Sequence, residues 1–405
     1  YIASYKNDNS VTPVFGSVDE LYKWNAHFLE GINTAPDAGL QQLADSIGKG
    51  KATQREKAAA VYAWVQAHIK YVAFEEGLEG FIPRQAADIY HKRYGDCKDM
   101  ASLLTALLKL SGIDARFVWI GTRHIPYSYK DVPLPITDNH MICAARIDKE
   151  WIFLDATDPN CIFGYPTSMI QDKQALISDG PDKYELVTVP VMAPEKSMII
   201  DSTFLSIQNT TLKGRCSVSY AGYFGSDLYN NLQQNKEDDE RVYVRRRMSK
   251  GSNKFIMNDY HIDYSDPAKK EAVISSHFDI PDYVKSIGDE IYINLNLERL
   301  LYGAIIDTAK RNVPVETEYQ YAIRQVHVLD IPAGYTVSYL PKNTSLSNNF
   351  TSLRIEYQQL PGKVIATQYY TVNNLYIPTS EFTQWNNILS KALYAYKEQV
   401  VLQKK

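Results

Sequence analysis

The stretch YGDCKDMASLLTALLKLSG places a cysteine where a polar turn becomes an amphipathic helix. The helix is predicted because apolar residues recur at helical spacing and a glycine follows them, at Met100, Leu103, Leu104, Leu107, Leu110 and Gly112. Asp96 is a good N-cap, so Cys97 would occupy the first helical position, beside amide N–H groups that have no partner within the helix. The positive end of a helix favours a thiolate by about 1–2 kcal/mol at most. Full activation of Cys97 therefore requires a histidine partner as well.

The length and the net charge of the chain limit the classes of protein to which it can belong. A chain of 405 residues can hold two or three domains with substantial cores. A net charge of −4 argues against a nucleic-acid-binding protein, which normally has a basic excess. The densest positive patch, RVYVRRR at 241–247, directly follows acidic residues, so we interpret it as the solvated face of a strand. No run approaches 18 consecutive apolar residues, and no transmembrane segment is predicted.

The four cysteines lack the spacing of a zinc site or of a disulfide framework, so we expect neither a metal nor another cofactor. They are Cys97, Cys143, Cys161 and Cys216. The 30 tyrosines, together with many Thr, Asn and Val residues, favour a β-rich protein outside the cytosol, in the periplasm, secreted or at the cell envelope. The chain begins at Tyr1 without a signal-peptide pattern, so we expect a mature form or an excised fragment.

The first part of the chain reads as helices followed by strands. Two capping-box patterns, Ser17 with Glu20 and Thr53 with Glu56, precede helical runs. After Gly112 the period changes to β-type runs, ARFVWIG, MICAARI and WIFLDAT. A proline-containing passage at 181–196 predicts the end of this domain.

Beyond residue 197 the chain is mostly short strands at a spacing typical of β-sandwiches. A second boundary is predicted near 312–314, which gives domains 1–194, 195–312 and 313–405. Within TEYQYAIRQVHVLDI the apolar alternation slips between Ile323 and Val326, which indicates a β-bulge. The final segment, SEFTQWNNILSKALYAYKEQVV, predicts a helix. The predicted fold is thus an α+β core followed by all-β, sandwich-like domains that end in a C-terminal helix.

Among the eight histidines, His140 is the best candidate to share a proton with Cys97. It opens the strand HMICAARI, which folds back through Asp148 and Lys149 into EWIFLDAT. With a two-residue loop, His140 and Asp155 are diagonal neighbours on one face of the hairpin, so imidazole and carboxylate can meet. A three-residue loop would put them on opposite faces. The alternative is that His140 merely begins a buried strand and Asp155 caps a turn, but an unpaired buried carboxylate is costly.

The order Cys97, His140, Asp155, with Trp151 eleven and Asp155 fifteen residues after His140, resembles the transglutaminase-like branch of the papain-like cysteine enzymes. The segment GDCKDMASLLTALLKLSGIDARFV is similar to the nucleophile segment of that branch. The sequence is closer still to bacterial multidomain transglutaminase-like proteins, which share a segment like GFIPRQAADIYHKRYGDCKD and an Asp-Ala-Thr-Asp run. Their usual N-terminal β domain is not represented here, whereas residues from about 319 to 402 resemble their C-terminal companion domain.

This resemblance, which covers roughly residues 50–190, implies a papain-like core and a role for each triad residue. Cys97 would be the nucleophile, His140 the general base and acid, and Asp155 the group that orients His140. The backbone N–H of Cys97 would form part of an oxyanion hole, and Gln85 and Tyr71 are candidates for the second donor. One position departs from many relatives, because Ile142 stands where they have an aromatic residue.

The expected function is therefore that of a cysteine acyltransferase or an amide or peptide hydrolase, acting on a protein or peptide amide through a thioester. No calcium-binding pattern is present, so calcium dependence is not expected. The alternative is a catalytically silent scaffold whose β domains bind a protein or glycan, for instance a cell-envelope partner, because one fold can host many functions.

Overall fold

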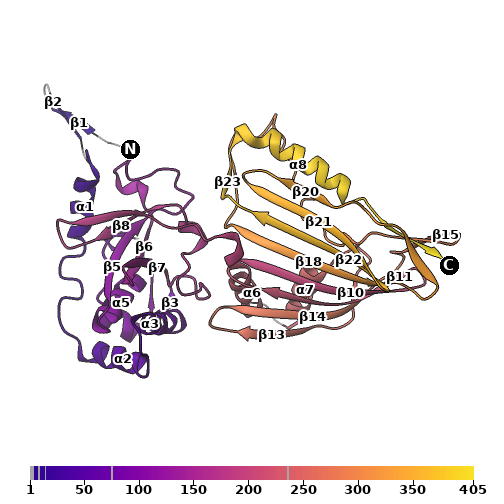
Figure 1. Ribbon diagram of the computed structural model, residues 1–405. Coiled ribbons are helices and arrows are strands. Elements are labelled where there is room, and N and C mark those ends of the chain that lie inside the picture. Colours follow the sequence, from indigo (N-terminus) through magenta and orange to yellow (C-terminus); the bar gives the residue numbers. More distant parts are fainter. Residues whose placement is uncertain (1–3, 8–9, 14, 74–75, 235–236) are drawn as a thin grey trace. The chain divides into compact units, whose positions relative to one another are not determined.

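The computed structural model describes residues 4–7, 10–13, 15–73, 76–234 and 237–405. The chain forms two compact units, Tyr1–Val191 and Met192–Lys405 (Figure 1). The division lies close to the end predicted for the first domain at residue 194.

The N-terminal unit combines helices with an antiparallel five-stranded sheet in the order β7-β6-β5-β8-β9. Its α-helices are α1 (Val18–His27), α2 (Ala38–Gly48), α3 (Gln54–His68), α4 (Ala86–Lys92) and α5 (Cys97–Leu110). The sheet strands are β5 (Asp114–Ile120), β6 (His140–Ile147), β7 (Glu150–Leu154), β8 (Gln174–Ser178) and β9 (Tyr184–Thr188). The shorter elements are a hairpin of β1 (Ser4–Asn7) with β2 (Ser10–Pro13), a parallel pair of β3 (Lys70–Tyr71) with β4 (Tyr94–Gly95), and the 3₁₀ turns η1 (Gly77–Gly80), η2 (Pro135–Thr137) and η3 (Ser168–Ile170).

Helix α5 is buried along almost its whole length and packs against the sheet and the neighbouring helices. Its predicted apolar face lies in the core with Cys143 and Leu154, while Ile142 and Phe153 join a separate cluster on the opposite side of the sheet. The helix ends before Gly112, whose φ of +77° is the left-handed conformation that glycine adopts readily at this position. The sequence therefore places α5 as the central element of this unit.

The C-terminal unit is built on a nine-stranded sheet in the order β12-β14-β11-β10-β18-β22-β21-β20, with β13 paired to β14. All pairs are antiparallel except β10 with β18, which run parallel. The strands are β10 (Met198–Gln208), β11 (Thr211–Tyr220), β12 (Ile256–Met257), β13 (His261–Asp266), β14 (Glu271–Ile280), β18 (Tyr321–Asp330), β20 (Thr344–Ser347), β21 (Thr351–Leu360) and β22 (Lys363–Val372).

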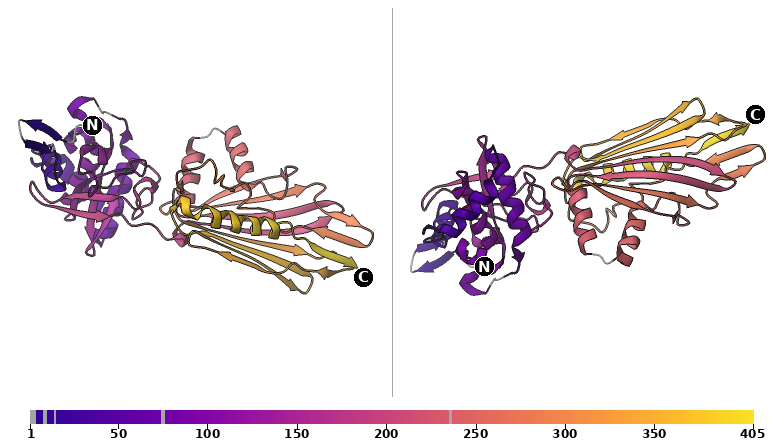
Figure 2. Two further views of the ribbon diagram at one scale, coloured as in Figure 1. Left: turned by 90° about the horizontal axis from the view of Figure 1, so that it is seen from above. Right: turned by 90° about the horizontal axis from the view of Figure 1, so that it is seen from below.

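The remaining elements of this unit are short strands and helices. A four-stranded sheet contains β15 (Lys285–Ile287), β16 (Glu290–Ile293), β24 (Val400–Lys404) and β19 (Tyr335–Tyr339), and β17 (Val315–Glu316) pairs with β23 (Tyr376–Ile377). The helices are α6 (Tyr223–Gln234), α7 (Glu237–Met248) and α8 (Phe382–Ala395), with 3₁₀ turns η4 (Pro194–Lys196) and η5 (Thr379–Glu381). Apolar residues of α6, α7 and α8 share one core with one face of the nine-stranded sheet, which we call the inner face. Both views of Figure 2 show α6 and α7 on the same side of that sheet.

The predicted strand at RVYVRRR is wrong, whereas the predicted C-terminal helix is confirmed over a shorter range. RVYVRRR belongs to helix α7, not to a strand, and buries Tyr243, Val244 and Met248 at helical spacing. Its last-turn arginines lie where the helix dipole favours cations. The C-terminal segment is helical only to Ala395, and β24 follows it.

The predicted division at residue 312 does not separate two compact units, because β10 pairs directly with β18 and one sheet joins strands from both sides of that position. The predicted bulge in β18 is also absent, since both of its ladders run without a register shift. The apolar slip has another cause. Gln325 and His327 point to the buried inner face, and Val326 and Val328 lie on the other face.

Gln325 and His327 belong to a polar network buried under the inner face. Lys250, whose side chain is fully buried, contacts Asp201 and lies 3.4 Å from Glu298 Oε1 and 3.3 Å from Thr203 Oγ1. His327 Nδ1 donates to the carbonyl of Leu295 at 2.7 Å, and burial lowers the pKa of His327, so its ring is neutral. The cost of removing such charged groups from water is offset only by their contacts with one another.

Candidate active site

The turn before α5 owes its shape to the residues of the GDCKD motif. Asp96 is the N-cap, accepting from the N–H of Asp99 at 3.2 Å, and Asp99 returns a bond to the N–H of Asp96 at 3.1 Å. A side chain at Gly95 would approach the Cβ of Asp99 to 2.5 Å, so this position requires glycine. Lys98 contacts the Asp96 carboxylate. Cys97 is consequently fixed as the first residue of α5, with its side chain half-buried.

Asp99 also ties this turn to the segment that precedes α4. The Arg84 guanidinium donates to Asp99 Oδ2 at 2.7 and 3.0 Å, and the Arg84 N–H donates to Oδ1 at 2.9 Å. Arg84 also bonds the carbonyl of Tyr94 at 2.9 Å. The segment IPRQAADIYHKRYGDCKD therefore acts as a single scaffold for the cysteine.

His140 and Asp155 meet as the hairpin arithmetic predicts. Asp148 and Lys149 form a two-residue turn with φ of 55° and 71°, and Ile147 pairs with Glu150. His140 is the first residue of β6, and Asp155 directly follows β7. His140 Nε2 donates to Asp155 Oδ2 at 2.8 Å, and both side chains are buried.

The Asp155 carboxylate is saturated with hydrogen bonds. Thr157 donates to Oδ1 from its N–H at 3.2 Å and from its hydroxyl at 2.6 Å, and the buried Thr167 hydroxyl donates to Oδ2 at 2.9 Å. The Tyr62 hydroxyl fixes the backbone carbonyl of Asp155 at 2.7 Å. The sequence-based prediction did not include Thr157 or Thr167 among the residues of the site. The Asp-Ala-Thr run could have pointed to Thr157, since an Asp side chain commonly bonds the residue two positions on, but no local signal marks Thr167.

The charges of the site stabilise an imidazolium–carboxylate pair. Burial alone would lower the pKa of His140, but the Asp155 carboxylate and the Cys97 side chain raise it to about 10. Burial alone would raise the pKa of Asp155, but His140 and the hydrogen bonds from Thr157 lower it to about 2. His140 therefore carries a proton at neutral pH, and it can donate that proton.

The structure brings Cys97, His140 and Asp155 into one cluster, since the Cys97 side chain is close enough to His140 to raise the pKa of the imidazole. Because Nε2 of His140 bonds Asp155, Nδ1 is the ring nitrogen that remains for the thiol. The other cysteines differ. Cys143, Cys161 and Cys216 are buried, and burial raises the pKa of each thiol, to about 12 for Cys143 and about 11 for Cys216.

The two candidates for a second oxyanion donor are placed differently. The side-chain amide of Gln85 is already hydrogen-bonded to the loop at 31–33. It donates to the carbonyl of Gly31 at 3.0 Å and accepts from the N–H of Asn33 at 2.7 Å. Tyr71 lies beside the Cys97 turn, because β3 pairs with β4 at Tyr71 and Gly95.

Among the described residues, no group of three His, Cys, Asp or Glu side chains is arranged to hold a metal ion. None of the described helices is long and apolar enough to cross a membrane.

Family models match the chain in two places. Residues 41–156 match the transglutaminase-like superfamily, and residues 289–402 match a domain of unknown function, DUF3858. These matches confirm the predicted resemblance and the predicted order of an α+β core followed by a β-rich part. Comparison with curated proteins gave no match.

One solved structure shows the same fold over the whole chain. A crystal structure described as that of a proposed protease from Parabacteroides distasonis ATCC 8503 aligns with all of this chain at a TM-score of 0.56 and 9% identity. The chain spans 63% of that protein's length. A proposed cysteine protease from Cytophaga hutchinsonii is 26% identical over 32% of this chain and 41% of its own, with a TM-score of 0.25.

Proposed function

We propose that this chain, which carries a transglutaminase-like domain over residues 41–156, is a cysteine-dependent enzyme that acts on amide bonds of peptides or proteins. Cys97 is the nucleophile, His140 the proton carrier and Asp155 the residue that orients His140. The observation that carries the proposal is the 2.8 Å bond from His140 Nε2 to Asp155 Oδ2, with Cys97, the first residue of α5, near the same imidazole.

In the first step the Cys97 thiolate attacks the amide carbonyl carbon, and the resulting oxyanion lies near the unbonded N–H groups of the first turn of α5. His140 gives its proton to the departing nitrogen, the C–N bond breaks, and a thioester and a free amine result. Neutral His140 then takes a proton from water, or from an acceptor amine, as that group attacks the thioester. The acyl product leaves, and the thiolate and the imidazolium are restored. Attack by water gives hydrolysis, and attack by an amine gives cross-linking.

Alkylation tests the thiolate directly. At pH 6.5 iodoacetamide should label Cys97 alone, because the other three cysteines are buried, and His140→Ala should slow the labelling at least about tenfold by removing the cation beside the thiolate. Peptide mass spectrometry measures both the rate and the site. Cys97→Ser, which should take up no label under native conditions, is the control. Labelling at equal rates with and without His140 would contradict the proposal and favour a catalytically silent domain.

Thr167 offers a test of how Asp155 is held. Thr167→Val removes one of the two hydrogen bonds to Oδ2 and should lower kcat roughly tenfold, with little change in KM, because a hydrogen bond to a charged group is worth about 1.5–3 kcal/mol. Thr167→Ser keeps the hydroxyl and should restore most of kcat. Steady-state kinetics on a casein-derived peptide, or incorporation of a fluorescent amine, gives the readout. If Ser and Val variants are equally impaired, Thr167 acts through packing and not through its hydroxyl.

A further inference from the structure

The nine-stranded sheet has a second face, which we call the outer face. The described helices of this unit pack on the inner face, and the residues between the buried positions of β10, β18 and β22 are half-buried or exposed. Aromatic, basic and hydroxyl-bearing side chains recur on this face. They include Ser202, Phe204, Arg215, Ser217, Arg324, Arg354, Thr367 and Tyr369.

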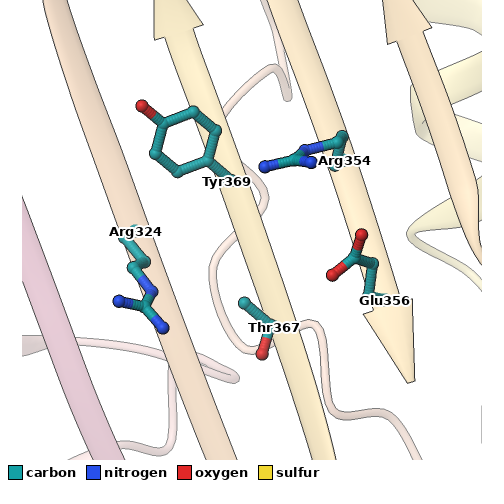
Figure 3. A pocket seen from close by; sticks show the side chains of 5 residues that line it. All are labelled: Arg324, Arg354, Glu356, Thr367 and Tyr369. Carbon is teal, nitrogen blue, oxygen red and sulfur yellow. The ribbon is translucent and has the colours of Figure 1, made fainter. Parts of the chain in front are cut away.

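One row of this face is formed by two arginines with a tyrosine between them. Tyr369 of β22 pairs with Arg324 of β18 on one side and with Arg354 of β21 on the other. The three side chains line a pocket of about 290 Å³, together with Glu356 and Thr367. Figure 3 shows the Arg354 guanidinium beside the Tyr369 ring, whereas the Arg324 side chain extends away from the ring toward Thr367.

The charges of this pocket favour an anion with a ring-shaped body. The Arg354 guanidinium carbon lies 5.5 Å from the centroid of the Tyr369 ring. Within the described ranges, neither Arg324 nor Arg354 forms an ion pair with a carboxylate. Paired guanidinium groups bind a carboxylate strongly and with defined geometry. Glu356 can accept hydroxyl hydrogen bonds and disfavours a second carboxylate at the same place.

A second aromatic–arginine pair lies on the same face. Phe204 of β10 is 39% exposed, and the Arg215 guanidinium carbon lies 4.2 Å from the centroid of its ring. Both line a pocket of about 430 Å³. Two strand spacings of ~4.8 Å and four residues at ~3.3 Å each separate Phe204 from Tyr369, or about 16 Å. By the strand register, Val326, Val328 and Ile365 lie between the rings together with the hydroxyl-bearing Thr367 and Ser202.

We propose that the outer face binds a linear polysaccharide that carries carboxylates, of the uronic-acid type. The exposed Phe204 ring and the half-buried Tyr369 ring suit the C–H faces of sugar rings, hydroxyl side chains suit sugar hydroxyls, and the arginines bind the carboxylates. An extended peptide would instead add to a sheet edge through its backbone, and these features lie on the face. The proposal does not depend on the chemistry of Cys97.

Calorimetry on the full chain with oligogalacturonates of increasing length tests this binding site. We expect binding that strengthens with length and that falls at least about tenfold in an Arg324→Gln/Arg354→Gln double variant. Phe204→Ala should weaken the longer oligomers and leave the shortest unchanged. Lys310→Gln, which removes an exposed cation elsewhere in the same unit, is the matched control and should bind as the parent does.

Three outcomes would overturn the proposal. They are no binding of any oligogalacturonate, equally tight binding of neutral cello-oligosaccharides, and equally tight binding of poly-L-glutamate. The last result would identify the face as a general site for acidic peptides and other polyanions. Equal losses in Lys310→Gln and in the double variant would likewise show unspecific charge attraction.

Discussion

Replacing Asp155 with Asn should lower kcat/KM on an amide substrate by about 10³–10⁴-fold while the N-terminal unit stays folded. The amide keeps the volume of the side chain, and its oxygen can still accept from Thr157. The NH2 group that replaces Oδ2 cannot accept from Thr167 or His140, and the charge that pairs with His140 is lost. Both the orientation and the proton affinity of the imidazole then change. The loss should fall on kcat more than on KM, because Asp155 acts through His140.

The dependence of activity on pH distinguishes this role of Asp155 in orienting His140 from a purely structural role. If the proposed function is correct, activity of the unaltered chain that needs protonated His140 should persist through neutral pH and fall as the pH rises through about 10. Asp155 makes the largest contribution that raises this pKa, so in Asp155→Asn the falling limb moves to lower pH. Thermal unfolding and hydrogen exchange of α5 provide the folding control. A variant that retains its activity, or one whose limb does not move, would contradict the assigned role.

Replacing Lys250 with Ala should destabilise the C-terminal unit by about 3–5 kcal/mol, because it leaves the buried Asp201 carboxylate and the half-buried Glu298 carboxylate without their cation. Asp201 and Glu298 are held beside the buried ammonium, and burial raises the pKa of Glu298 to about 7 even with that partner present. Hydrogen exchange of the β10 and β18 peptides in increasing urea measures the loss in this unit alone.

Two further variants test whether the buried charge is the cause. Lys254→Ala removes a lysine that is paired with Asp282 at 2.8 Å but largely exposed, so little change is expected. Lys250→Met combined with Asp201→Asn removes both charges of the tightest contact and should be more stable than Lys250→Ala. A Lys250→Ala variant as stable as Lys254→Ala would show that the network contributes nothing.

The sequence predicts best where a local rule determines the outcome. The capping pattern of Asp96 fixes the start of α5, and the pair Asp148-Lys149 selects a two-residue turn, which sets the meeting of His140 and Asp155. Prediction from the sequence fails where contacts between distant parts of the chain determine the structure. The polar residues Gln325 and His327 face the core because they belong to a buried polar network. The apolar alternation in the sequence therefore predicted a bulge that is not there. The boundary at residue 312 was wrong for a similar reason, since strand pairing across it leaves no local trace. Thr167 reaches Asp155 only through the folding of the loop that carries it.

The parallel pairing of β10 with β18 has a consequence for the order of assembly. Each strand has its other neighbour in an antiparallel ladder, so this one contact joins two antiparallel halves of the sheet that could form separately. Because β18 follows β10 only after a long intervening segment, the centre of the sheet closes late, and non-local pairing of this kind is slow. Until then β10 is an exposed edge strand, a common starting point for aggregation. A chain cut after residue 312 would keep that edge open, so fragments of the C-terminal unit should be poorly soluble even when the whole unit is stable.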